Sequence, residues 1–164
     1  MTRVGLVLGS KSDMPVAEKA LGVLREFNIP FEVRILSAHR SPDEAREFAS
    51  SAREGGFSVL IAFAGMAAHL AGALAANTTL PVIGVPCKGS CFDGMDALLS
   101  TVMMPSGIPV ATVAVNGGAN AALLALQIIG TSDSEVAAKL EEHRAKGKAA
   151  VLEADAEVRS TYTL

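Results

Sequence analysis

The segment RVGLVLGSKSDMPVAEKALGVLREF, residues 3–27, contains an apolar run, a polar turn and a helical pattern in that order. Arg3–Leu8 is short and rich in Val and Leu, which is typical of a buried strand. Met14–Phe27 carries apolar residues at helical spacing. A strand that leads directly into a helix is the first half of a βαβ unit, and such units predict a parallel sheet.

The same alternation continues along the chain. Further strand patterns occupy Phe31–Leu36, Ser58–Phe63, Pro81–Val85 and Pro109–Val115, and further helical patterns occupy Pro42–Glu54, Ala67–Ala76, Gly94–Met103 and Ala119–Ile129. Strands separated by helices run parallel, are buried, and are covered by helices on both faces. We therefore predict an α/β fold: a three-layer, doubly wound parallel sheet of the flavodoxin-like kind, with strand order 2-1-3-4-5.

The C-terminal part of the chain has a different composition. From residue 132 it is charged and helical, with apolar residues at three- and four-residue spacing, so it predicts a helix with one apolar stripe. We expect a flavodoxin-like domain with the catalytic site over residues 1–131 and a helical tail over 132–164. The stripe would pack on neighbouring subunits or, alternatively, on its own domain.

Composition restricts the function classes. The chain has 164 residues, which suits one domain with a sizeable core; 50% are hydrophobic but only 4% aromatic, so Ala, Val, Leu and Ile must fill that core. The formal net charge is -3 and no cluster of Lys and Arg offsets it, so nucleic acid is not an expected partner. An anionic ligand would need a local set of donors.

The sequence also predicts no membrane span and a cytoplasmic location. Leu60–Ala76 is the longest weakly polar stretch, but it includes His69 and is shorter than the roughly 20 apolar residues that cross a bilayer. No basic and then apolar leader precedes the first strand pattern. Cys87 and Cys91 lack metal-ligand spacing, so we expect free thiols and no metal site.

In an open parallel sheet, ligands bind where the carboxyl ends of the strands meet the following loops. The first such loop runs from Gly9 through Ser10 and Ser12 to Asp13. Its glycine, its hydroxyls and the amides of the next helix suit a phosphate, although the loop matches neither a mononucleotide nor a dinucleotide motif. Asp13 would either cap the helix from Met14 or bind ribose hydroxyls.

The second loop, SAHRSPDE at residues 37–44, combines a helix start with polar side chains. Ser41, Pro42 and Glu44 fit a capping serine, a first-turn proline and the acid of a capping box. Ser37, Ala38, His39 and Arg40 precede this cap and would lie at the ligand edge. Arg40 could pair with a phosphate, and His39 either titrates in the site or is a solvated surface residue.

The third loop contains Ala64, Gly65, Ala67, Ala68 and His69. Its small residues would allow a flat ring to approach the backbone. His69 falls one turn into the apolar helix predicted from Ala67. It would therefore be either a ligand-facing group or a buried histidine bonded to backbone.

Five segments in order now resemble a known family. They are GSKSDMPV from Gly9, SAHRSPDE from Ser37, AGMAAHLAGALAANTTLPVIGVP from Ala64, MPSGIPVATVAV from Met104 and ANAALLALQI from Ala119. Over residues 3–130 the chain resembles the class I N5-carboxyaminoimidazole ribonucleotide mutases of purine (IMP) biosynthesis, also called phosphoribosylaminoimidazole carboxylase catalytic subunits.

The resemblance implies a homo-octamer of flavodoxin-like domains that uses no metal and no organic cofactor. Its reaction moves a carboxylate from the exocyclic nitrogen of an imidazole ribonucleotide to a ring carbon, through carbon dioxide held in the site. His39 would be the acid/base, because a histidine side chain exchanges protons near neutral pH. The implied substrate-binding residues are Gly9, Ser10, Ser12, Asp13, Ser37, Ala38, Arg40, Ala64, Gly65, Ala67, Ala68, His69 and Leu70.

Within that set, Ser10, Ser12 and Asp13 would hold phosphate and ribose. Ser37 and Arg40 would hold the phosphate. The pocket for the base and carbon dioxide would be walled by Gly65, Ala67, Ala68, His69 and Leu70.

Two positions depart from the family pattern. Met66 stands where a second glycine is usual, and Ala71 stands where a proline is usual. A second branch of the family carboxylates the uncarboxylated ribonucleotide directly, lacks the histidine of the third loop and usually has lysine in place of Arg40. His69 and Arg40 favour the mutase branch. Two alternatives stay open: a direct carboxylase of this or a related nucleotide, and a non-catalytic nucleotide-binding module on the same fold.

Overall fold

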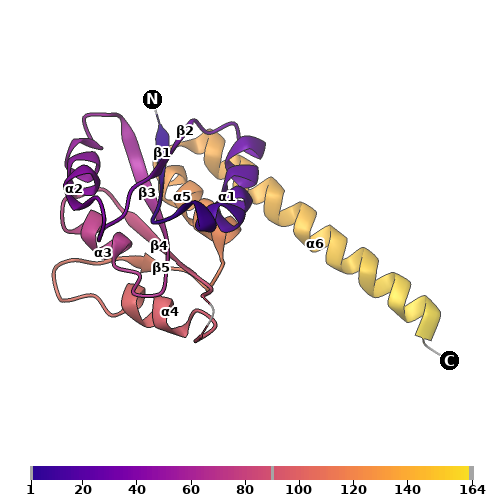
Figure 1. Ribbon diagram of the computed structural model, residues 1–164. Coiled ribbons are helices and arrows are strands. Elements are labelled where there is room, and N and C mark those ends of the chain that lie inside the picture. The colour runs from indigo at the N-terminus through magenta and orange to yellow at the C-terminus, as the bar shows by residue number, and fades with distance from the viewer. Residues whose placement is uncertain (1, 90, 163–164) are drawn as a thin grey trace. The chain divides into compact units, whose positions relative to one another are not determined.

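The computed structural model describes residues 2–89 and 91–162 (Figure 1). The chain divides into two compact units, Met1–Ala125 and Leu126–Leu164. The first contains one parallel sheet in the order β2-β1-β3-β4-β5. Its strands are β1 (Arg3–Leu8), β2 (Phe31–Ile35), β3 (Phe57–Gly65), β4 (Val82–Cys87) and β5 (Ala111–Thr112). The predicted doubly wound parallel fold and its strand order are confirmed.

Helices alternate with the strands. They are η1 (Lys11–Asp13), α1 (Met14–Glu26), α2 (Pro42–Ser51), α3 (Leu70–Ala75), α4 (Met95–Val102), α5 (Gly118–Gly130) and, in the second unit, α6 (Ser134–Tyr162). In Figure 1, α2 and α3 lie on one side of the sheet and α1 on the other. The face of α1 that is buried repeats at helical spacing through Ala17, Ala20, Leu21 and Leu24.

The core between α2, α3 and the sheet is built from small and branched side chains, as the composition predicts. Phe48 and Ala49 of α2 and Leu74 of α3 share a buried cluster with Leu60 of β3 and Val82 of β4. Phe48 and Phe57 meet with ring centroids 5.4 Å apart. Because few large rings are available, the helices lie close to the sheet.

Gly84 shows how close this packing is. A Cβ atom on Gly84 of β4 would lie 2.3 Å from Cγ2 of Thr101 in α4 and 3.2 Å from Cβ of Ala71 in α3. Both helices therefore cover the same face of β4. Ala71 is buried in this contact.

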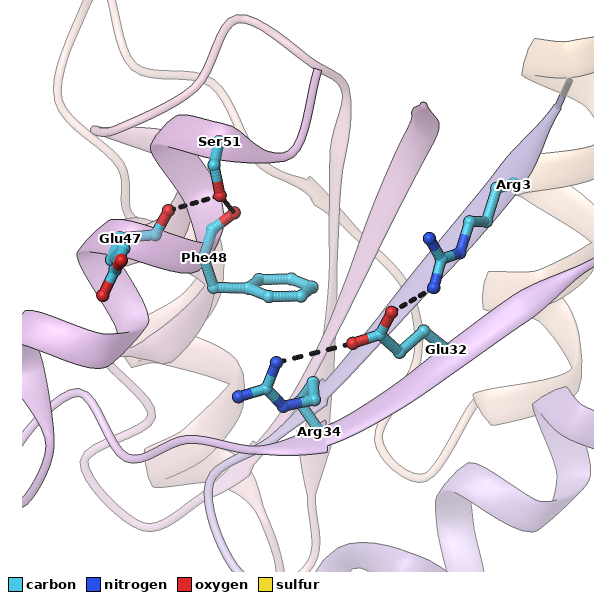
Figure 2. A network of polar contacts seen from close by, with 6 residues as sticks. All are labelled: Arg3, Glu32, Arg34, Glu47, Phe48 and Ser51. Atoms are coloured by element: carbon cyan, nitrogen blue, oxygen red, sulfur yellow. Dashed lines mark hydrogen bonds and ion pairs between the residues drawn. The ribbon is translucent and has the colours of Figure 1, made fainter. Parts of the chain in front are cut away.

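The prediction that β2 is a buried strand is wrong. β2 is an edge strand in which Arg34 and Ile35 are exposed and the residues before them are half-buried. Figure 2 shows the side chains along it: Glu32 accepts from Arg3 of β1 and, at 3.4 Å, from Arg34. Charged side chains on an edge strand hinder pairing with other chains.

Several predicted boundaries differ from the structure. Pro109–Val115 was expected as a strand, but only Ala111–Thr112 pairs with β4. Pro109 has no N–H to donate, and the backbone turns at Asn116, where φ is 58°. At the other end of the sheet, α2 ends at Ser51, and not at Glu54 as predicted.

The predicted helical tail is present as α6 in the second unit. Its start is capped by Asp133, whose Oδ1 accepts from the amides of Glu135 at 3.0 Å and Val136 at 3.1 Å. Along the rest of α6, the described side chains are mostly exposed. Within residues 2–89 and 91–162, no helix combines the length and the apolar content that crossing a membrane requires.

We expect Gly118→Ala to destabilise the fold. A Cβ on Gly118, at the start of α5, would lie 2.2 Å from the carbonyl oxygen of Val16 in α1, which is backbone and cannot move aside alone. Overpacking of this kind costs about 1–3 kcal/mol, measurable as a lower midpoint in urea. Gly22→Ala is the control, since nothing lies within 4 Å of its Cβ position. In the interior of α1 it should raise stability by about 0.5–1 kcal/mol. Equal midpoints for both variants would contradict the packing described.

Candidate functional site

The carboxyl ends of the four longer strands meet at one edge of the sheet. Leu8 of β1 pairs with Ile35 of β2 and Phe63 of β3, and Gly65 pairs with Cys87 of β4. The loops after these strands enclose a cavity of about 570 Å³. It is lined by Gly9, Ser10, Ser12, Asp13, Ser37, Ala38, His39, Arg40, Ala64, Gly65, Met66, Ala67, His69, Leu70, Lys88 and Gly89.

The first loop is held by a capping box. Ser10 Oγ accepts from the amide of Ser12 at 3.3 Å, and Asp13 Oδ2 accepts from the amide of Ser10 at 2.9 Å. Asp13 makes no side-chain cap for α1, so the prediction that it caps this helix is wrong. The Ser10 and Ser12 hydroxyl oxygens lie 3.0 Å apart at the cavity wall.

Asp13 is the most buried charged side chain of the site. Burial raises its pKa, and this outweighs the hydrogen bonds from the Ser10 amide and the Cys87 thiol, which lower it. Burial, and then the Asp13 charge, raise the pKa of Cys87 to about 12. A pKa this high favours the thiol form of Cys87 near neutral pH, and a thiol is a poor nucleophile.

The second loop is folded around Ser37. Ser41 Oγ accepts from the Ser37 amide at 2.8 Å and donates to the Ser37 carbonyl at 3.2 Å. It makes no cap hydrogen bond to α2, so the capping box predicted in SPDE does not form, although Pro42 begins the helix as expected. The serine instead closes the loop that carries His39.

Arg40 joins the first two loops. Its Nη2 donates to the carbonyl of Gly9 at 3.1 Å, and its Nε donates to Ser37 Oγ at 3.4 Å. The guanidinium is thereby held at the start of the first loop, in the cavity that Ser10 and Ser12 also line. Preorganised donors of this kind suit a phosphate.

The third loop differs most from its prediction. The helix begins at Leu70 and not at Ala67, because residues 66–69 form tighter turns in which Ala68 donates to the carbonyl of Met66 and His69 donates to that of Ala67. His69 is exposed at the N-cap, so the interpretation as a buried structural histidine is wrong. Ala68 is buried and does not line the cavity, unlike the other predicted site residues.

The two loop histidines meet at the cavity. The rings of His39 and His69 stack with centroids 5.9 Å apart and an angle of 20° between their planes. Both side chains are exposed to the cavity. Two imidazoles in contact, flanked by a guanidinium and by hydroxyls, can exchange protons with a ligand anchored by its anionic end.

Sequence reasoning missed three lining residues: Met66, Lys88 and Gly89. Met66 has a left-handed backbone with φ of 56°, which is unfavourable for a residue with a side chain, and that side chain is 70% exposed. Lys88 directly follows β4. A place directly after a strand is also what identified the other three loops as ligand-binding candidates. Among the described residues, no group of three or more His, Cys, Asp and Glu is arranged to hold a metal ion.

Known proteins similar to the chain include some that it matches over nearly their whole length and others of which it spans only about a quarter. N5-carboxyaminoimidazole ribonucleotide mutases of Thermotoga maritima and Bacillus subtilis are each 51% identical to it, covering 93% and 92% of this chain and 90% and 94% of those proteins. Phosphoribosylaminoimidazole carboxylase of Saccharomyces cerevisiae is 53% identical over 91% of this chain, which spans only 26% of the yeast protein.

A crystal structure of Treponema denticola PurE superposes with a TM-score of 0.86 at 28% identity and covers 100% of both chains. A sequence model of the family described as AIR carboxylase matches residues 3–150. That match takes in the whole sheet and all four loops of the cavity. The chain belongs to the AIR carboxylase family.

Proposed function

We propose that the protein is an N5-carboxyaminoimidazole ribonucleotide mutase, an enzyme of purine biosynthesis that forms 4-carboxy-5-aminoimidazole ribonucleotide. The observation that carries this proposal is the stacked pair of His39 and His69 beside Arg40 in one cavity. The mutases of Thermotoga maritima and Bacillus subtilis, which match the chain almost end to end, support it.

In this proposal the first two loops bind the 5′-phosphate and the ribose. Ser10, Ser12 and Ser37 supply hydroxyls, and Arg40 supplies the charge. The bonds from Arg40 to Gly9 and Ser37 hold the guanidinium before the ligand binds, so less side-chain freedom is lost on binding. Asp13 faces the same wall and would accept from ribose hydroxyls.

His39 would be the acid/base. Cleavage of the bond between the exocyclic nitrogen and the carboxylate releases carbon dioxide and leaves the nitrogen to take up a proton. Formation of the bond between carbon dioxide and the ring carbon then displaces a proton from that carbon. One histidine that gives the first proton and accepts the second balances the reaction without a net change.

The third loop would hold the carbon dioxide between these two steps. Ala64, Gly65 and Ala67 leave the backbone accessible, and a Cβ on Gly65 would come within 3.2 Å of the Cys87 carbonyl oxygen. Retaining the small molecule beside the ring makes recombination effectively unimolecular. Buried Ala68 would support this wall from behind.

Direct carboxylation of the uncarboxylated ribonucleotide is the second candidate. The yeast relative is named a carboxylase, and so is the family. Both reactions form the same carbon–carbon bond and need the same proton acceptor, so the cavity suits both. A non-catalytic nucleotide-binding module is less well supported, because simple binding does not need two histidines in contact.

We further propose a cytoplasmic homo-octamer. Exposed apolar side chains follow one another around α4, at Phe92, Met95, Leu99, Val102 and Met103. Stripes of this kind are typical of interfaces. The apolar residues of α6, including Val151 and Leu152, would pack on neighbouring subunits, and the domain and tail would divide at about residue 131 as predicted from the sequence.

The choice of substrate tests the proposed function. We expect the purified protein to convert N5-carboxyaminoimidazole ribonucleotide to product without added bicarbonate. Product formation is measured by chromatography. Aminoimidazole ribonucleotide with bicarbonate should react far more slowly at matched concentration. Turnover only with aminoimidazole ribonucleotide and bicarbonate would overturn the mutase in favour of the carboxylase, and binding of both without turnover would favour the non-catalytic module.

The role of His39 predicts that His39→Asn loses kcat by about 10²–10⁴-fold, the usual contribution of a general acid/base. Ligand affinity should change little, because asparagine keeps the polar character and the phosphate donors are untouched. His143→Asn, the same change on α6, is the control and should keep full kcat. Full activity of His39→Asn in a steady-state assay would remove the proposed mechanism.

The raised pKa of Asp13 predicts that replacing it with asparagine increases stability at neutral pH but weakens substrate binding. Its folded-state pKa is raised above the ordinary value of 3.8, so its contribution to stability is greatest below that pH and is lost as the pH rises through the raised pKa. Asparagine does not ionise. Asp13→Asn should therefore gain stability relative to wild type as the pH rises from about 3 to about 7, while substrate affinity falls. A stability difference in urea that is the same at all pH values would contradict this account.

A further inference from the structure

Lys88 is the strongest feature of the cavity that the proposed function does not use. Among the described residues that line the cavity, Arg40 and Lys88 are the two with a permanent positive charge. Arg40 lies with the phosphate-type donors of the first two loops. Lys88 follows β4, the strand next to β3, whose loop carries His69.

The backbone segments that hold these two cations are separated in the sheet. The Arg40 guanidinium reaches the carbonyl of Gly9 after β1, whereas Lys88 follows β4, two positions away in the sheet. At roughly 4.8 Å per strand, the ends of β1 and β4 are about 10 Å apart at the backbone. A ligand with an anionic group at each end can use Arg40 for one group and Lys88 for the other.

The backbone of Lys88 is fixed. Its amide donates to Oδ1 of Asn116 at 2.9 Å, and the Asn116 amide donates to the carbonyl of Pro86 at 2.8 Å. Gly94 packs against it from the other side, where an added Cβ would lie 3.3 Å from Cα of Lys88. The Cα is therefore anchored at the cavity wall while the ammonium group remains on a flexible stem.

The ammonium group has an exchangeable partner. Lys88 Nζ lies 2.9 Å from Oδ1 of Asp93, and the two side chains are 56% and 79% exposed. Ion pairs this exposed contribute little to stability, so another carboxylate can replace Asp93 at small cost. Asp93 itself has a left-handed backbone, with φ of 53°, followed by Gly94 with φ of 90°, so the turn presents its carboxylate to Lys88.

We propose that Lys88 is a specificity residue that binds the carboxylate of carboxylated aminoimidazole ribonucleotides, exchanging Asp93 for the ligand. This inference rests on the proposed function, which supplies a ligand with a phosphate at one end and a carboxylate at the other. Lys88 then distinguishes carboxylated from uncarboxylated ribonucleotides, and Asp93 competes with the ligand for the ammonium group.

The test is calorimetric titration with two ligands that differ only in the carboxylate: 4-carboxy-5-aminoimidazole ribonucleotide and 5-aminoimidazole ribonucleotide. Lys88→Met should raise Kd for the carboxylated ligand about 10- to 150-fold, the range of a hydrogen bond to a charged group. Kd for the uncarboxylated ligand should change less than about 2-fold, because it has no group for Lys88. Lys88→Arg should retain most of the discrimination.

Two further variants sharpen the result. Asp93→Asn removes the competing carboxylate. It should lower Kd for the carboxylated ligand by about 2- to 5-fold, the effect of a weak exposed ion pair, and leave Kd for the uncarboxylated ligand unchanged. Lys19→Met is the matched control: it removes the same charge from an exposed position of α1, outside the cavity lining, and should change neither Kd.

The outcomes separate this inference from the proposed function. Equal weakening of both ligands by Lys88→Met would show that Lys88 acts on the shared phosphate or on the general field, and would overturn the proposal. No weakening of either would overturn it as well. If the wild-type protein binds neither ribonucleotide, the proposed function fails and the role of Lys88 fails with it.

Discussion

The parallel register of β1 with its two neighbours is the constraint on which the site depends. Leu8 is level with Ile35 on one side and Phe63 on the other, so β1 and β2 end together, and β3 continues for two residues to end level with β4 at Gly65 and Cys87. A slip of one residue would move every side chain of a strand to the opposite face of the sheet and disrupt the packing on both faces, so it is strongly disfavoured. Residues far apart in sequence, such as Ser12 and His69, share a cavity because of this register.

Several non-glycine residues near this edge of the sheet have a left-handed backbone, which is unfavourable for residues with a side chain. The non-glycine residues with positive φ are Asn28, Met66, Asp93 and Asn116 among the described residues. Asn28 follows α1, but Met66 lines the cavity, and Asp93 and Asn116 bond to Lys88. Such conformations cost about 1–3 kcal/mol each and persist only where the surrounding contacts determine them. Together with the burial of Asp13, they indicate that this edge is built for ligand binding and against maximal stability.

Sequence patterns predicted the features that follow from strand order. Ser10, Ser37 and His39 were assigned to the cavity because each follows a strand, and the structure brings them together there. The errors concern local competition for hydrogen bonds. Ser41 has the capping position of α2, but its hydroxyl bonds Ser37, because closing the preceding loop satisfies both a donor and an acceptor there. No spacing in the sequence distinguishes these two uses of a serine.

Lys88 and His69 were misjudged for different reasons. The segment after β4 was considered only as a metal site, although its position alone places Lys88 at the ligand edge. His69 was assigned to a helix interior because small residues precede it, and alanine favours helix so strongly that the tight turns at residues 66–69 leave no trace in the pattern. Those turns start at Met66, which has a left-handed backbone. A glycine at this position would have indicated a turn, because glycine adopts that conformation readily.

Membership of the family does not by itself decide between transfer and direct carboxylation, and the physical reason lies in what the two reactions share. Both join carbon dioxide to the same ring carbon and remove the same proton, so both need a phosphate anchor and a base. They differ in where the carbon dioxide comes from. A mutase must also place a proton on the exocyclic nitrogen and retain the released molecule until it recombines. In the proposed mutase those demands would fall on the histidine pair and on the wall from Ala64 to Leu70. The sheet and the proposed phosphate donors would serve either reaction.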